Sequence, residues 1–186
     1  MQTILLVKLC HTTFISSQEM NSDCIVTVEG FYVSGRYVAK ELTMLFDENN
    51  YQHFMFNCPK NLVLSNKDVK TVEFAKRLNG LELENNSFLP YSTIECILSF
   101  IKDCYIQTAG FQAKSFLESY LPKTEVKDLC IEFGFKYPKT LQQAPCFVQH
   151  PSRYCTLSKA RTIYIAIQIF NANFASKLSA IQKTVK

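Results

Sequence analysis

The hydrophobic pattern of this 186-residue chain changes near residue 60, and this change limits the folds that the chain can adopt. Before that point three segments, 23–33, 37–46 and 52–57, have the two-residue alternation and the β-branched or aromatic residues typical of strands. Ser34-Gly35 and the polar stretch 47–50 leave only short connections between them. We therefore predict three consecutive antiparallel strands.

Helical and strand patterns alternate in the rest of the chain. Ser65 is a predicted helix cap, Gly80 ends that helix, and Pro90 opens the next one. Further helices are predicted at 112–120 and 157–170, and short strands at 104–108 and 126–131. This order predicts an α/β domain with a mixed sheet, in which three antiparallel strands precede alternating helices and strands and helices flank the sheet.

The chain divides into an N-terminal extension (1–22), one domain (23–172) and a basic C-terminal tail (173–186). No run of about 18 apolar residues predicts a transmembrane helix, so we expect no membrane partner. Lys8 and His11 interrupt the apolar stretch 3–15, so we do not predict a signal peptide there. The eight Cys residues lack the density of a small disulfide scaffold, so we expect reduced thiols in an intracellular protein, cytoplasmic or nuclear.

Charge is distributed unevenly along the chain. The residues after Glu132 contain eight of the 20 Lys and Arg residues and none of the 16 Asp and Glu residues. This asymmetry predicts that the C-terminal part faces a polyanion, although a solvated basic helix and tail would look the same. The predicted nucleic-acid-binding residues flank the start of the last helix: Arg153, Tyr154, Lys159 and Arg161. The basic side chains would neutralise phosphates and the tyrosine would stack on a base, or all four are ordinary surface residues.

Four short segments carry motifs in a characteristic order: 26–31 (Val-Thr-Val-Glu-Gly-Phe), 105–117 (ending Lys-Ser-Phe-Leu), 126–129 (Val-Lys-Asp-Leu) and 155–160 (Cys-Thr-Leu-Ser-Lys-Ala). Together, over roughly residues 23–170, they resemble the proofreading-exonuclease (DEDD-type) branch of the ribonuclease H-like fold. The resemblance implies this fold and, in active members, a cluster of carboxylates that holds two metal ions.

The chain departs from that family at the residues that would bind metal. Thr27 replaces the first-motif Asp, Lys159 occupies the last-helix position, and only Glu29 is retained. One carboxylate cannot hold two cations, and a Lys would repel Mg²⁺. We therefore expect no catalytic residues, only vestigial motif positions, in a protein that binds RNA or single-stranded DNA. The alternatives are a protein-interaction scaffold on the same fold and a nuclease that works without metal.

Cys146, His150 and Cys155 lie within ten residues, just before the last helix. Thiolate and imidazole ligands suit tetrahedral Zn²⁺, and the fourth ligand would be Glu29, Cys24 or Cys130. The segment resembles the zinc-binding end of the Maelstrom domain, which has lost the exonuclease residues, and also related arthropod proteins of mobile-element or viral descent. Its Cys-to-His spacing differs from Maelstrom by one residue. The resemblance implies a structural zinc, whereas the alternative is two ordinary buried Cys and a surface His.

Overall fold

The three predicted N-terminal strands form the antiparallel part of the sheet. The structure is a computed structural model that describes residues 23–144 and 154–184, with side chains as far as residue 176. Strand β1 (Asp23–Val33) pairs with β2 (Arg36–Leu45), and β2 pairs with β3 (Tyr51–Met55). The tight Ser34-Gly35 turn joins the first two strands, and both of its residues have positive φ.

The remaining elements alternate as predicted and complete a mixed sheet. They are α2 (Asn66–Asn79), a short 3₁₀ helix (Tyr91–Thr93), α3 (Ile94–Ser99), β4 (Tyr105–Thr108), α4 (Phe111–Tyr120), β5 (Val126–Asp128), α5 (Leu129–Phe133) and α6 (Thr156–Thr184). The strand order is β3-β2-β1-β4-β5, with β4 parallel to β1 and β5 parallel to β4. The prediction of an α/β domain with a mixed sheet flanked by helices is confirmed.

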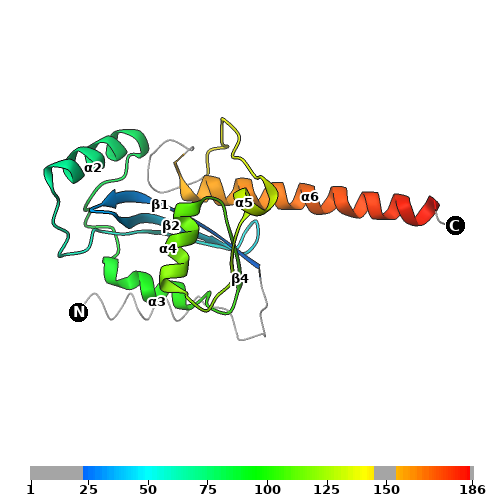
Figure 1. Ribbon diagram of the computed structural model, residues 1–186, viewed down its shortest axis with the longest axis horizontal. Coiled ribbons are helices and arrows are strands. Elements are labelled where there is room, and N and C mark those ends of the chain that lie inside the picture. The colour runs from blue at the N-terminus through cyan, green and yellow to red at the C-terminus, as the bar shows by residue number, and fades with distance from the viewer. Residues whose placement is uncertain (1–22, 145–153, 185–186) are drawn as a thin grey trace.

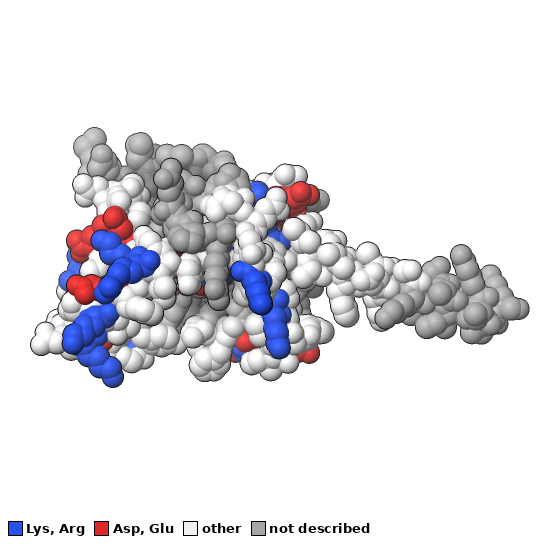
Figure 2. All heavy atoms as spheres, turned by 90° about the horizontal axis from the view of Figure 1, so that it is seen from above, with Lys and Arg blue, Asp and Glu red and all other residues white. Residues whose placement is uncertain are grey.

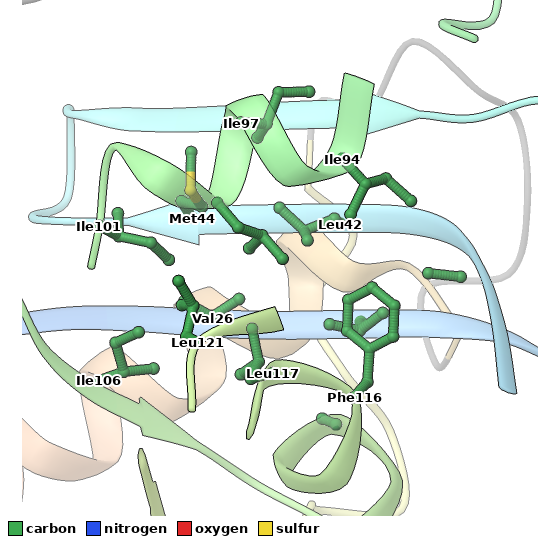
Figure 3. Close-up of a cluster of buried hydrophobic side chains, with 14 of the residues drawn as sticks. Val26, Leu42, Met44, Ile94, Ile97, Ile101, Ile106, Phe116, Leu117 and Leu121 are labelled. Carbon is green, nitrogen blue, oxygen red and sulfur yellow. The ribbon is translucent and has the colours of Figure 1, made fainter. Parts of the chain in front are cut away.

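The two faces of the sheet are covered by different helices (Figure 1). Residues of β1 alternate between the faces, so Val26 packs against α3 and α4, whereas Ile25 packs against α6. Figure 3 shows the larger cluster, in which Val26, Leu42 and Met44 of the sheet meet side chains from α3 and α4. The odd-numbered residues of this part of β1, including the motif positions Thr27 and Glu29, therefore face α6.

Two predicted elements end at other residues than expected. The strand predicted at 126–131 stops at Asp128, because the Asp128 carboxylate accepts from the backbone N–H of Cys130 and caps α5. The last helix continues past Phe170 to Thr184, because no Gly or Pro interrupts residues 157–184. The segment that we predict as a tail thus continues α6, and the extension 1–22 lies outside the described residues.

Helix α2 is anchored to the β1–β2 turn through its own cap. Ser65 and Asp68 form a capping box, and the Asp68 carboxylate also accepts from the backbone N–H and the hydroxyl of Ser34, at 2.8 and 2.9 Å. The hydrogen bonds from Ser65 and then Ser34 hold the pKa of Asp68 well below its usual range. The predicted cap at Ser65 and stop at Gly80 are both confirmed.

Candidate functional site

A polar cavity of about 340 Å³ lies where β1, the start of α4 and the first turns of α6 meet. Its walls come from residues of 27–32, from residues of 109–113, and from the side chains of Tyr37, Tyr137 and Lys159. Three of the four motif segments, 26–31, 105–117 and 155–160, therefore contribute to one cavity. The topology explains this convergence, because β4 pairs in parallel with β1 only as far as Ile25 and Gln107, and the chain after β4 therefore follows the rest of β1.

An ion pair crosses this cavity. The ammonium of Lys159 on α6 donates to the carboxylate of Glu29 on β1, and both side chains are more than four-fifths buried, at 17% and 19% exposed. The same ammonium lies 5.7 Å from the centre of the Tyr137 ring. Glu29 is the only Asp or Glu among the residues that line this cavity in the described chain. The structure thus brings together Glu29 and Lys159, two of the three residues that we predict as vestigial motif positions, and neutralises the only carboxylate among the described lining residues.

The third vestigial position, Thr27, belongs to a buried polar network that fixes the start of α6. The Thr27 hydroxyl donates to the carbonyl oxygen of Thr156 at 2.7 Å, and the Thr156 hydroxyl lies 2.7 Å from that of Thr43. Glu41, which is fully buried, accepts from the Thr156 backbone N–H at 3.1 Å. Nε2 of His53 lies 2.8 Å from the same Glu41 oxygen. Thr27, which we predict to stand in place of the first-motif Asp, therefore ties the helix to the sheet.

Our sequence analysis missed Glu41 and His53. The available signal was the Lys40-Glu41 pair in the middle of a predicted strand, because adjacent strand residues point to opposite faces. In a strand that is packed on at least one face, one of two adjacent charged side chains must therefore be buried. In β2 both Lys40 and Glu41 are buried. Lys40 donates to the carbonyl oxygen of Leu83 on the other face, at 2.6 Å.

Three tyrosines shape the cavity. Burial raises the pKa of Tyr37 and of Tyr137, so both phenols stay neutral. Tyr32 is 42% exposed, and its ring makes an edge contact with Tyr37, with 5.3 Å between ring centres. Tyr32 therefore offers a solvent-accessible aromatic surface beside the Tyr37 ring.

The start of α4 also contributes to the cavity. Gly110 precedes the helix with φ 116°, no side chain of the described residues caps the helix, and its first turn contains no acidic residue. The Gly110 N–H donates to buried Asp128 at 3.0 Å, so Asp128 positions this turn and takes no part in lining the cavity. The first N–H groups of a helix carry partial positive charge, which favours an anion.

The predicted basic cluster is divided between two places. Arg161 lies two residues after Lys159, roughly 200° around the helix, and lines a different cavity of about 500 Å³. Its guanidinium lies 5.4 Å from the centre of the Tyr51 ring. Tyr154 is half-buried, and Arg153 lies outside the described residues. Figure 2 shows Lys and Arg in separate groups on the face in view, one of them at the α2 end.

The predicted zinc ligands are described only in part. Cys146 and His150 lie outside the described residues, whereas Cys155 is fully buried against Ala144, Leu157 and Tyr51. Among the candidate fourth ligands, Glu29 is paired with Lys159, Cys24 is buried on the α3/α4 face and Cys130 is half-buried. Within 23–144 and 154–176, no group of three or more His, Cys, Asp or Glu residues could hold a metal ion. A zinc site that includes Cys146 and His150 therefore stays a prediction.

Comparison with known proteins finds no matching family, no similar curated protein and no similar solved structure.

No disulfide joins any two of the six described cysteines. None of the helices in the described ranges is both long enough and apolar enough to cross a membrane.

Proposed function

We propose that this chain is a ribonuclease H-like protein of the exonuclease branch that has lost catalysis and binds RNA or single-stranded DNA in the cavity between β1, α4 and α6. The observation that carries the proposal is the Glu29–Lys159 ion pair. Two features support the fold: β4 and β5 follow the antiparallel strands in parallel orientation, and three motif segments meet at one cavity.

The loss of catalysis follows from the charge of the cavity. Phosphoryl transfer with two metal ions needs several carboxylates around cations about 4 Å apart. Here one carboxylate faces one ammonium, and the Thr27 hydroxyl is engaged with α6. A divalent cation would have to displace Lys159 and would then find one carboxylate ligand among the described residues lining the cavity.

We therefore expect no degradation of labelled single strands in the presence of Mg²⁺ or Mn²⁺. The assay compares wild type with Glu29→Gln, with and without a chelator, and both should leave the strands intact. Degradation that the chelator and Glu29→Gln both abolish would contradict the proposed loss of catalysis. Degradation that neither abolishes would identify the metal-independent nuclease.

Binding is supported by the other features of the same cavity. Its volume is at the lower end of the range for small-ligand sites, which suits one nucleotide rather than a duplex. The exposed ring of Tyr32 can stack on a base, and Lys159 and the start of α4 can contact phosphate. Because Lys159 is already paired, phosphate must compete with Glu29 for the ammonium.

This competition predicts opposite effects for the two halves of the ion pair. Lys159→Gln should weaken single-strand binding by about tenfold. It should also reduce the slope of log affinity against log salt concentration by about one, the value for one lost phosphate contact. Glu29→Gln should tighten binding, because it releases the ammonium from the pair and removes a negative charge. Fluorescence anisotropy with a labelled oligonucleotide at two salt concentrations measures both effects. A merely structural ion pair would shift affinity in the same direction in both variants.

Two further variants complete this experiment. Lys123→Gln is the matched control, because Lys123 is exposed and precedes β5, at the edge of the sheet away from the cavity. Tyr32→Ala should lose roughly 1–3 kcal/mol of stacking at either salt concentration, whereas Tyr32→Phe should bind like wild type. If wild type shows no binding at low salt, the proposal fails in favour of the protein-interaction scaffold.

A further inference from the structure

The second half of α6 extends beyond the rest of the domain. The helix has 29 residues, and its early turns pack on β1 and β2. From Asn171 to Thr184 it runs for roughly 20 Å and projects past the edge of the sheet (Figure 1). Residues 162–176 contain no charged side chain, and Figure 2 shows this stretch as an uncoloured surface.

An apolar stripe continues from the core onto this extension. Ile163 and Ile167 pack against the sheet, and Phe170 and Phe174 follow on the same side of the helix. The two phenylalanines are 60% and 56% exposed, and their rings are stacked with 6.5 Å between centres. In the sequence, Lys177 follows Phe174 at the same spacing, and Ile181 comes one step after it. The stripe therefore begins as core and continues as exposed surface.

A cavity of about 350 Å³ opens at the base of the stripe. It lies between β4, α5 and α6, and its apolar walls include Phe133, Phe135 and Phe170. The Phe133 ring lies 6.2 Å from that of Phe170, so the cavity and the stripe form one continuous surface. Asp23, which is exposed, lies at this cavity together with Ile167. We call the cavity and the stripe the α6 surface.

We propose that the α6 surface binds the α6 surface of a second copy of this chain, with the two helices antiparallel and crossing near Phe170 and Phe174. In this two-fold arrangement, the extension of each copy covers the cavity of the other. Position 181 of one copy lies opposite Ile163 of the other, and position 177 lies opposite Ile167. In a two-fold dimer both copies use the same patch in the interface, so each copy covers the apolar extension of the other with the same contacts.

Charge favours a second copy over other occupants. The acidic group at the cavity is Asp23, and the approaching helix belongs to a part of the chain that has no Asp or Glu. In this arrangement position 177, which is a Lys, lies opposite Ile167, a residue of the cavity to which Asp23 also belongs. Positions 161 and 183, an Arg and a Lys, lie two residues from stripe positions, roughly 200° around the helix. The basic positions of the two helices therefore do not face each other across the crossing.

The first test changes the exposed stripe. We expect wild-type protein to sediment as a dimer, and Phe174→Asp to raise the dissociation constant more than about 30-fold, since a hot-spot residue occurs twice in a symmetric interface. Phe74→Asp is the matched control, because Phe74 is similarly exposed on α2 and should leave the dimer intact. Far-ultraviolet circular dichroism spectra that match the wild-type spectrum would show that both variants fold.

The second test asks whether the partner is another copy in this orientation. Asp23→Lys and Lys177→Asp should each weaken the dimer, and the two changes combined should restore it. Failure of the combined variant to recover, or a dimer that persists in Phe174→Asp, overturns the proposed interface. A wild-type monomer at every concentration also overturns it. If that monomer sediments with phosphatidylserine vesicles and Phe174→Asp does not, the α6 surface binds lipid instead.

Discussion

Gly30→Ala is expected to remove most of the free energy of unfolding of the domain. A Cβ atom at residue 30 would lie 2.0 Å from the carbonyl oxygen of Val38 and 2.9 Å from its carbonyl carbon. Both are backbone atoms of β2, so no side-chain rotation relieves the overlap. The two strands must separate, at a cost of several kcal/mol against the roughly 5–15 kcal/mol that a domain of this size has in total.

The effect should reach the cavity as well as stability. The register between β1 and β2 shifts at Glu29 and Gly30, and such irregularities re-aim the neighbouring side chains. Urea denaturation followed by circular dichroism measures the loss. Gly35→Ala is the matched control, because Gly35 has φ 78° but a Cβ atom there would meet no atom within 4 Å. It should cost about 1–2 kcal/mol through the left-handed backbone alone. Equal losses for the two variants would contradict the close approach at Gly30.

Local patterns are sufficient to predict most of the secondary structure. The β-branched residues of β1 suit a strand that different helices cover on its two faces, and Ser65 and Gly80 fix the ends of α2 by their own chemistry. Asp128 shows where such patterns fail. Its neighbours continue the apolar pattern of a strand, but its carboxylate caps the next helix and ends the strand. Helix α6 is longer than predicted, because no Gly or Pro ends it after Phe170, and the apolar residues past the core are exposed.

The candidate site is predictable only where the motif order carries the information. The motif order singles out Glu29 and Lys159, although it does not predict their pairing across 130 residues. The role of Glu41 depends on Thr156, which lies 115 residues away, and no local period encodes that contact. Lys159 and Arg161 resemble one basic cluster because they are close in sequence, but the helix turns them toward different cavities.

Glu41→Ala should be the second severe change, because Glu41 connects β2 and β3 to the start of α6. Its carboxylate is fully buried and accepts from the Thr156 backbone N–H and from His53. Removal leaves these two buried donors without that acceptor, and each such unsatisfied group costs about 1–3 kcal/mol.

The same change should loosen α6 before it unfolds the sheet. Thr156 is the first residue of the helix, and Lys159 follows one turn later, so the Glu29–Lys159 pair depends on this anchor. Hydrogen exchange should therefore speed up in the first turns of α6 at denaturant concentrations where β1 and β2 stay protected. Thr43→Val is the matched control, since it removes one hydrogen bond to Thr156 and should cost only about 1 kcal/mol. If Glu41→Ala and Thr43→Val lower the unfolding free energy equally, Glu41 is not the anchor of α6, and the position of Lys159 in the cavity must be set by the packing of Ala160 and Ile163 alone.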